Sequence, residues 1–391
     1  MLTRVFLMKK YCFSSEIRSH CHLYNYFVLE EKTMKAARFY TAKDLRVDNV
    51  PDEAPQGDEV RIQVKWCGIC GSDLHEFLDG PIFTPGDTPQ YETGCTNPVT
   101  MGHEFSGVVV AVGPDVKNFK VGDRVIPEPL VVDYDCPSCK EGNYNVCDHL
   151  SFLGFVSNNG GLAEYCNFTE KFVHHMPDNM SFEDGAIVEP LSVGYHSLRV
   201  GHFEAGQTAV VAGAGPIGLA TIASLKALGA KQIIAVQRKS VRQQYALNTG
   251  ADIVLDPNTD DVVAKVKELT NGEGADVAFE TTSSEQCFHL LRDCIKPHGY
   301  EVITSIWTSN ITMNPNVLVL TEKHIVGSIC YQGNDFEDVI ALLSSGKLKV
   351  PGYVTKKVLL DRVLEDGFGT LTGPDKKAQV KILVTPDASL L

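Results

Sequence analysis

The sequence lacks both an excess of positive charge and a hydrophobic run long enough to span a bilayer. Lys and Arg number 35 against 49 Asp and Glu, which gives a formal net charge of -14. A surface this acidic repels nucleic-acid phosphates and anionic lipid, so we expect no nucleic-acid partner and no membrane partner. The most apolar stretch, residues 209–225, contains three glycines and a proline and suits a buried strand that leads into a helix. The expected partners are therefore small molecules.

Disulfides are unnecessary in this chain, although cysteine is abundant. A chain of 391 residues with 43% hydrophobic residues can bury a core without covalent cross-links. The 12 cysteines include two close groups, and clustering of this kind indicates metal binding.

Residues 1–33 form a poorly patterned extension ahead of a strand-like run that begins near Met34. The segment has the position of a targeting peptide, but Glu16, Glu30 and Glu31 are unusual in transit sequences, which are poor in acids. An alternative translation start is an equally good explanation. We expect a cytoplasmic protein, with an organellar address left open.

The length of the chain predicts two domains, and the pattern of apolar and turn residues differs between them. From residue 34 to 187, short strands such as residues 60–65 and 105–112 alternate with turns, which is typical of a barrel-like β domain. From residue 208 to 346, apolar runs alternate with stretches of helical length, which predicts an α/β fold with a doubly wound parallel sheet. These runs lie at residues 209–212, 232–236, 252–255, 276–279 and 301–304. Residues after 350 return to strand-like sequence ending at 380–384, and we expect them to complete the first domain.

A glycine-rich loop stands between a predicted strand and a predicted helix. Residues 210–218 read Val-Val-Ala-Gly-Ala-Gly-Pro-Ile-Gly, and a helical run at 219–228 follows. In such a motif the first glycine makes a tight turn, the second lets the backbone approach a pyrophosphate, and the third allows close helix packing. The pyrophosphate is expected at the helix N-terminus. A glycine motif alone can be a simple tight turn, but the second strand at 233–236 favours a dinucleotide site at Gly213, Gly215, Pro216, Ile217 and Gly218.

The end of that second strand lacks the acidic residue that binds the ribose of NAD in many enzymes. Gln237 occupies the position, and it has no carboxylate to repel a 2′-phosphate. Arg238, Lys239 and Arg242 follow it and can neutralise such a phosphate. The alternative is that Arg238 and Lys239 are only the solvated start of the next helix. We expect NADP to be favoured over NAD.

Residues 67–75 read Cys-Gly-Ile-Cys-Gly-Ser-Asp-Leu-His, and no second cysteine pair follows at the spacing of a zinc ribbon. Gly-His-Glu at 102–104 and Ile-Val-Glu-Pro at 187–190 add an imidazole and carboxylates. A catalytic zinc takes about three protein ligands and leaves one position for a substrate oxygen. The candidate ligands for a catalytic Zn²⁺ are Cys70, His103, Glu104 and Glu189.

A second group of metal-binding residue types lies further along the chain, at Asp133, Cys136, Cys139 and Cys147. A Cys-x-x-Cys pair with a third thiol after one short loop suits a closed, tetrahedral structural zinc. Buried reduced cysteine is the alternative explanation for each group taken alone, and the occurrence of both groups in one chain makes it less attractive.

Together these motifs resemble the zinc-containing medium-chain dehydrogenase/reductase family over nearly the whole chain from Met34 onward. Gly-His-Glu-x-x-Gly at 102–107, with Gly113 and Val116, is similar to the family signature. The resemblance implies a GroES-like β-barrel catalytic domain at residues 34–190 and 347–391. It also implies a Rossmann-type doubly wound parallel sheet at residues 191–346. By the same resemblance Cys70 and His103 are catalytic zinc ligands, Glu104 ligates or approaches the metal, and Glu189 is the fourth-position acid of the polyol branch.

Within the family, the sequence is most similar to the fungal (R,R)-butanediol dehydrogenases, through residues 67–75, 79–83 and 188–193. Sorbitol dehydrogenases share the first and last of these segments, but they carry a substrate-binding arginine near residues 328–331, which here read Ser-Ile-Cys-Tyr. We therefore expect a small vicinal diol or its hydroxyketone as substrate, of the 2,3-butanediol and acetoin type. A sorbitol- or xylitol-type polyol dehydrogenase is the alternative.

Two positions depart from the family pattern. The structural zinc lobe normally has four cysteines, and the first of those positions is Asp133 here. Because carboxylates can ligate zinc, Asp133 can still close the site, although less securely than a thiolate. The second departure, Gln237, argues against the usual NAD preference.

The resemblance implies that zinc lowers the pKa of the substrate alcohol while hydride passes to the nicotinamide. Ser72 and His75 stand at the family's relay positions and are expected to carry the hydroxyl proton toward solvent. The alternative for His75 is a purely structural histidine. Asp73 is expected to support the zinc ligands rather than to act as an acid or base.

Two other classes of protein share parts of this pattern. A zinc-free quinone reductase or a cofactor-binding regulatory protein of the same fold would lack the cysteine, histidine and glutamate set. A zinc-ribbon nucleic-acid binder conflicts with the acidic charge and the intact dinucleotide loop. Homodimers or homotetramers are usual in the family.

Overall fold

The computed structural model of this protein describes residues 32–391, and Thr33–Leu391 forms one compact unit. The predicted extension at residues 1–33 lies almost wholly outside the described residues. Among residues 32–391, no helix is both long enough and apolar enough to cross a membrane.

Strands from the two ends of the described chain meet in one seven-stranded sheet. β18 (Lys381–Thr385) pairs antiparallel with β3 (Glu59–Gly68), and β17 (Val354–Leu359) pairs parallel with β18. The other strands of this sheet are β5 (Glu104–Val112), β6 (Arg124–Pro127), β9 (Tyr165–Thr169) and β10 (Val173–His175). The C-terminal strands thus extend a sheet that the N-terminal half begins, while the domain limits at residues 190 and 346 stay predictions.

Smaller elements surround this sheet. β1 (Thr33–Thr41), β2 (Asp44–Pro51) and β4 (Val99–Thr100) form a three-stranded antiparallel sheet, and β7 (Leu130–Val131) pairs with β8 (Ser151–Phe152). The helices of these segments are α1 (Gly71–Asp79), α2 (Pro137–Lys140), α3 (Phe182–Ala186) and α11 (Gly369–Thr372).

The middle of the chain forms a six-stranded parallel sheet with the order β13-β12-β11-β14-β15-β16. Its strands are β11 (Thr208–Ala212), β12 (Gln232–Val236), β13 (Ile253–Leu255), β14 (Ala275–Glu280), β15 (Ile295–Ile303) and β16 (His324–Gly327). This is the strand order of a dinucleotide-binding sheet, in which the order reverses beside the first strand. The predicted α/β fold class, a β domain plus a Rossmann-type sheet, is confirmed.

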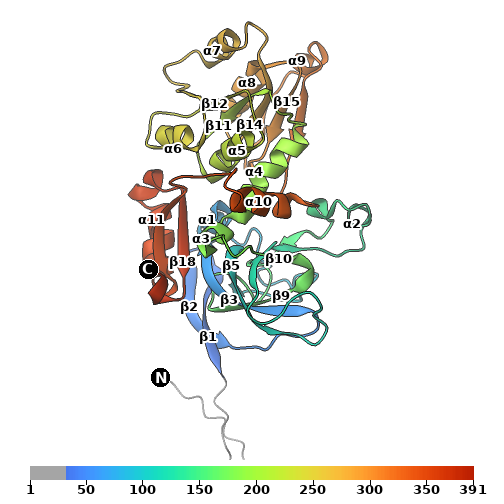
Figure 1. The fold of residues 1–391 in the computed structure, drawn as a ribbon, viewed down its shortest axis with the longest axis vertical. Coiled ribbons are helices and arrows are strands. Elements are labelled where there is room, and N and C mark those ends of the chain that lie inside the picture. Colours follow the sequence, from blue (N-terminus) through green and yellow to red (C-terminus); the bar gives the residue numbers. More distant parts are fainter. Residues whose placement is uncertain (1–31) are drawn as a thin grey trace, which may run out of the picture. The chain divides into compact units, whose positions relative to one another are not determined.

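Helices cover both faces of the parallel sheet (Figure 1). The helices of this part of the chain are α4 (Val188–Val200), α5 (Pro216–Ala227), α6 (Arg242–Thr249), α7 (Val262–Leu269), α8 (Glu285–Cys294), α9 (Asn316–Val319) and α10 (Asp335–Ser344), the last of which packs against α4. Successive strand residues point to opposite faces, so Val211 joins the core that also contains α4, α5 and the β domain, whereas Val210 joins a second core with α7 and α8. Burial on both faces explains why these strands read as continuous apolar runs.

Three details differ from the sequence expectations. α5 begins at Pro216, three residues before the predicted helical run, because proline is well tolerated in the first turn. β15 begins at Ile295 and passes through Pro297, His298 and Gly299, which read as turn residues. The sequence pattern did not predict β16, because four residues are too few to show a period.

A buried carboxyl group lies within the parallel sheet. Glu301 pairs with Ala278 on β14 and with Ile325 on β16, and its side chain is fully buried. Neither carboxyl oxygen has a hydrogen-bond partner among the described residues. Burial raises the pKa of Glu301 to about 8, so the group is largely protonated in the folded protein at neutral pH.

The original chain should lose folding stability as the pH rises, because the buried Glu301 resists ionisation. We predict that Glu301→Gln removes this loss. The folded-state pKa is raised above the ordinary value of 4.5, so the contribution of Glu301 to stability is complete below about pH 4.5 and is lost as the pH rises to about 8. The stability of the variant relative to the original should therefore rise between pH 5 and pH 9, by on the order of 3 kcal/mol. Urea unfolding at several pH values measures this difference. Glu273→Gln, at an exposed position, is the matched control and should give a flat difference.

Candidate active site and cofactor loop

Two segments of the chain bring three of the four predicted catalytic ligands together. Cys70 directly precedes α1, and its backbone N–H donates to the Asp73 carboxylate at 2.8 Å. His103 and Glu104 lie at the start of β5. One ligand atom from each of Cys70, His103 and Glu104 lies within 4.8 Å of the other two. The residues that the sequence separates by more than thirty positions thus form one compact donor group.

Glu104 also belongs to a buried ion pair with Lys381 of β18. The Lys381 Nζ lies 2.6 Å from both carboxylate oxygens and donates to the Ile69 carbonyl at 3.2 Å. Both side chains are almost fully buried, at 1% and 0% exposure. Burial lowers the pKa of Lys381, but the Glu104 carboxylate more than offsets it and raises the pKa overall. A side chain at Gly68 would collide with Glu104, so this glycine leaves the space that the ion pair needs.

His103 lies in strongly acidic surroundings. Its Nδ1 is 3.5 Å from the Asp73 carboxylate. Burial lowers the pKa of His103, but Asp73 and Cys70 more than offset this and bring it to about 10. Burial raises the pKa of Asp73 itself to about 6. The cluster is therefore suited to a cation rather than to an anion.

An aromatic wall stands beside the cluster. The rings of His103 and Phe155 have centroids 5.1 Å apart, and Phe83 lies 5.4 Å from Phe155. Phe155 is buried, and Phe83 packs against the same core. A substrate at the metal ligands would therefore meet an apolar surface on this side.

Ser72 and His75 differ in their surroundings. The Ser72 hydroxyl lies 3.3 Å from Nε2 of His103, whereas His75 is exposed and has no hydrogen bond to any residue of the described chain. The two residues are three positions apart on α1, so they occupy adjacent positions on the helix surface. The relay role of His75 stays a prediction.

Glu189 lies in the first turn of α4 and is buried, but it is not one of the three residues of the compact donor group. Burial, followed by the nearby Glu104 carboxylate, raises its pKa to about 7. Its charge therefore acts on the cluster, and direct ligation by Glu189 stays a prediction.

The donor group fits a zinc ion by the chemistry of its atoms. A thiol, an imidazole and a carboxylate are the ligand types that zinc takes, and three protein ligands leave one position for a substrate. Cys67, the other half of the Cys-x-x-Cys motif, is fully buried in the core, and burial raises its pKa well above the ordinary value. Cys67 is therefore a core residue rather than a ligand.

The residues of the second predicted metal group also lie close together. The ligand atoms of Asp133, Cys136, Cys139 and Cys147 all lie within 4.8 Å of one another. One Asp133 oxygen accepts the backbone N–H groups of Asp135 and Cys136, at 2.9 and 3.0 Å. The other lies 3.0 Å from Nδ1 of His149. The backbone N–H groups, followed by His149, lower the pKa of Asp133, so its carboxylate is charged and suited to a metal.

The glycine loop joins β11 to α5 as the motif predicts. Gly213 has φ +95, and a side chain at Gly218 would collide with the Gly213 carbonyl, so the first and third glycines make the turn and the close packing. A Cβ at Gly215 would have only the Arg242 guanidinium within 4 Å, at 3.7 Å. The backbone at the N-terminus of α5 is thus open for a ligand to approach, as a pyrophosphate requires.

Arg242 is the predicted phosphate-binding residue that lies closest to this opening. Its Nη2 donates to the Gln379 carbonyl at 2.9 Å, and its buried Nε has no partner among the described residues. Burial lowers its pKa, and it has no ion pair in the described chain. Gln237 accepts from the Ala214 backbone N–H at 2.9 Å, directly at the loop. Arg238 and Lys239 are exposed, and the NADP preference stays a prediction.

Two features of the site escaped the sequence interpretation. The sequence pattern places Lys381 in a predicted strand but gives it no role at the site. A lysine at the start of an otherwise apolar strand is itself a sign of a buried ion pair. Phe155 has no local signal, because it reaches His103 through a loop between β8 and β9.

Comparison with known proteins identifies related sequences over most of the chain. Residues 56–178 match the family "Alcohol dehydrogenase GroES-like domain", and residues 216–345 match "Zinc-binding dehydrogenase". The (R,R)-butanediol dehydrogenase of Bacillus subtilis is 45% identical over 90% of this chain and 100% of its own length. The enzyme of that name from Saccharomyces cerevisiae is 33% identical over 90% of this chain and 98% of its own. The expected similarity to butanediol dehydrogenases is confirmed, and this bacterial relative is more similar than the yeast one.

Solved structures agree with this result. The crystal structure of 2R,3R-butanediol dehydrogenase from Bacillus subtilis has a TM-score of 0.85 and 44% identity, and covers 90% of this chain and 100% of its own. A zinc-binding dehydrogenase from Sinorhizobium meliloti bound to NADP has a TM-score of 0.80 and 27% identity, covering 91% and 100%. An alcohol dehydrogenase from Escherichia coli complexed with NADH has a TM-score of 0.81 and 26% identity, covering 90% and 99%. Both nicotinamide cofactors therefore occur among similar structures.

We predict that Asp133 is a zinc ligand of the second metal group. Asp133→Ala removes the carboxylate and should weaken zinc retention at this site at least about tenfold. Asp133→Cys restores four thiols and should retain zinc through longer chelator treatment than the original chain. Elemental analysis during dialysis against a chelator measures both effects.

His149→Ala is the matched control, because it removes the partner of Asp133 but none of the four candidate ligands. It should change zinc retention less than Asp133→Ala does. Equal zinc loss from the original chain and from Asp133→Ala would show that Asp133 is not a ligand.

Proposed function

This chain belongs to the zinc-binding alcohol dehydrogenase family, and from that premise we propose that it interconverts a small vicinal diol and its hydroxyketone. The reaction is of the 2,3-butanediol and acetoin type, with hydride transfer to or from NAD(P). The observation that carries the proposal is the donor group of Cys70, His103 and Glu104 with the Phe155 ring 5.1 Å from the His103 ring. A metal-binding group beside an apolar wall suits a short substrate with one reacting oxygen and apolar ends.

Cys70, His103 and Glu104 would hold the zinc, and Glu189, whose pKa burial raises to about 7, would lie near them. When bound, zinc supplies Lewis-acid chemistry, which lowers the pKa of a hydroxyl placed at its open position. Lys381 donates to both oxygens of the Glu104 carboxylate and so fixes its orientation beside the other candidate ligands. Asp73 accepts the Cys70 backbone N–H and faces the His103 ring, so it orients two of the candidate ligands.

Proton transfer begins at Ser72 in this proposal. The Ser72 hydroxyl adjoins the His103 nitrogen, so it can accept the proton of a substrate hydroxyl placed at the donor group while it releases its own hydroxyl proton toward His75. His75 lies one turn along α1 at the surface and passes that proton to solvent.

Glycine-loop contacts support NADP as the preferred cofactor. Gln237 has no carboxylate to repel a 2′-phosphate, and Arg242 is a cation beside Gly215 with no acidic partner in the described chain. The exposed Arg238 and Lys239 add two further cations at the end of β12. Guanidinium groups are well suited to phosphate recognition.

The remaining parts of the proposal are assembly, location and substrate range. We propose a cytoplasmic homodimer or homotetramer that takes small-molecule substrates and binds neither nucleic acid nor membranes. The open edge of β16 in the parallel sheet of the described chain supports self-association, because an unpaired strand edge can pair with another chain. A zinc-free quinone reductase is disfavoured by the cysteine, histidine and glutamate group, and a sorbitol-type enzyme by the uncharged Cys330 and Tyr331.

We predict that Cys70→Ala abolishes turnover while the fold persists. Cys70 adjoins α1 without filling the core, so thermal unfolding should stay cooperative. The kcat/KM with 2,3-butanediol should fall at least about a thousandfold, since the metal loses one of about three ligands. Elemental analysis should show lower zinc content in the variant. Full turnover by a metal-free Cys70→Ala protein would overturn the zinc mechanism.

We predict faster turnover of 2,3-butanediol than of sorbitol, and a higher kcat/KM with NADP than with NAD. Initial rates with each of the four combinations measure both preferences. Gln237→Asp introduces a carboxylate at the end of β12 and should shift the preference toward NAD by about tenfold or more. Faster oxidation of sorbitol would favour the polyol alternative, and an NAD preference in the original chain would contradict the cofactor proposal.

A further inference from the structure

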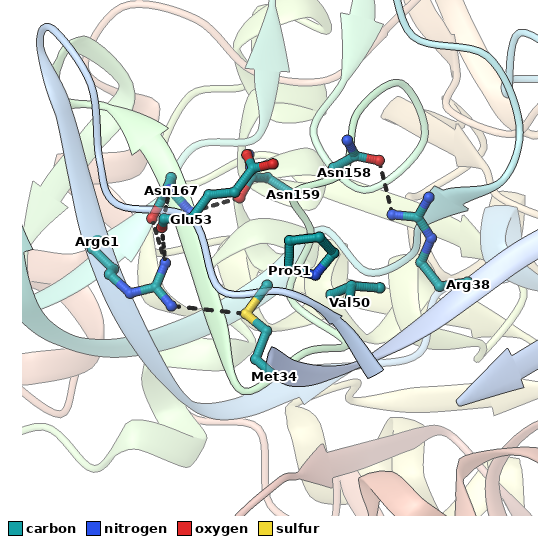
Figure 2. Close-up of a pocket in the computed structure, with 9 residues that line it drawn as sticks. All are labelled: Met34, Arg38, Val50, Pro51, Glu53, Arg61, Asn158, Asn159 and Asn167. Carbon is teal, nitrogen blue, oxygen red and sulfur yellow. Dashed lines mark hydrogen bonds between the residues drawn. The ribbon is translucent and has the colours of Figure 1, made fainter. Parts of the chain in front are cut away.

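A cavity lies among residues that take no part in the catalytic group. It has a volume of about 230 Å³ and lies between β1, the end of β2, β3, β9 and the loop before β9 (Figure 2). This volume is many times what one water molecule needs and is enough for a small organic molecule. Its polar lining comes mainly from two arginines and three asparagines.

Arg38 is a buried cation without a carboxylate partner. It is 8% exposed, and its guanidinium donates to Thr100 Oγ1 at 3.2 Å, to Asn158 Oδ1 at 2.9 Å and to the Pro98 carbonyl. All three acceptors are neutral, and Arg38 makes no ion pair within residues 32–391. Burial lowers the pKa of Arg38 and outweighs the opposing effect of the nearby Tyr40 and Asp48.

Arg61, on the other wall, has its charge balanced. It forms an ion pair with Asp52, donates to Asn167 Oδ1 at 3.0 Å, and lies 4.6 Å above the Tyr165 ring. The uncompensated charge of the cavity therefore belongs to Arg38.

The asparagine amides leave further donors free. Asn158 Oδ1 accepts from Arg38, and Asn159 Oδ1 accepts from the Asn167 backbone N–H at 2.9 Å. Both partners can only donate, so the orientation of each amide is settled and each NH₂ group lies on the other side. Neither NH₂ group donates to a described residue. The unused polar groups contributed by Arg38, Asn158 and Asn159 are therefore donors.

We propose that this cavity binds a small organic carboxylate. The anionic oxygens would accept from the amides of Asn158 and Asn159 and neutralise Arg38, and charge-assisted hydrogen bonds of this kind are the strong ones. Met34, Val50 and Pro51 supply an apolar wall, which favours a carboxylate with a short hydrocarbon body over inorganic phosphate. Glu53 is the one acidic residue that lines the cavity, and its side chain is exposed.

The test is calorimetric titration of the full chain with sodium butyrate, at an ionic strength held constant with sodium chloride. Saturable binding in the millimolar range is the expected result. Sodium phosphate is the second probe and should bind more weakly than butyrate. Absence of butyrate binding at 50 mM, or tighter binding of phosphate, overturns the proposal.

Two substitutions with opposite expected effects on butyrate affinity test whether butyrate binds in this cavity rather than at the zinc or nucleotide site. Asn158→Asp keeps the oxygen that accepts from Arg38 but replaces the free amide by a charged acceptor, and should weaken butyrate binding at least about tenfold. Glu53→Gln removes the acidic side chain while leaving the backbone carbonyl that accepts from Arg61 and Asn167, and should tighten binding about threefold.

Glu273→Gln makes the same charge change away from the cavity and should leave butyrate binding unchanged. Because Glu53 is exposed and its carboxylate holds no hydrogen bond to the described chain, the Glu53→Gln result stands even if Asn158→Asp impairs folding. Butyrate affinity that is the same in the original chain and in both cavity variants would show that butyrate binds elsewhere.

Discussion

The buried ion pair between Glu104 and Lys381 is the interaction on which the catalytic region depends. It joins residues 277 positions apart and lies where β3, β5 and β18 run side by side, next to the candidate zinc ligands. Two charges removed from water are stable only when their geometry satisfies both, and loss of one partner of such a pair costs about 3–5 kcal/mol. The pairing of β18 with β3 therefore also places the Lys381 ammonium group against the Glu104 carboxylate.

Charge is distributed unevenly in this acidic protein. Two buried cations face carboxylates, Lys381 with Glu104 and Arg61 with Asp52. Arg242 and Arg38 differ, because each is held by neutral oxygens and makes no ion pair in the described part of the chain. Arg242 lies beside the glycine loop. Arg38 lines the cavity between β1, β2, β3 and β9. In a chain with a net charge of -14, such unbalanced guanidinium groups mark the positions where an anionic ligand is favoured.

Much of the fold and the site could be predicted because their signals are local. The parallel strands are buried on both faces and appear as apolar runs, and the glycine loop is a continuous motif. The spacing of Cys136, Cys139 and Cys147 reflects a short stretch of chain that brings the three thiols close together. β16 could not be predicted, since a four-residue strand is recognised only by its pairing with β15. The partners of Arg38 and Arg61 likewise come from distant loops and strands.

The sequence by itself determined the fold class, the dinucleotide loop and the residue types of both metal groups, because these depend on periodicity and on spacing along the chain. Only the tertiary structure decided that Cys70, His103 and Glu104 form one compact group while Glu189 lies outside it, and that Cys67 belongs to the core. It also decided that Lys381 meets Glu104 and that Arg38 stays without a carboxylate. These outcomes depend on distances between segments far apart in sequence, and no local pattern encodes such distances.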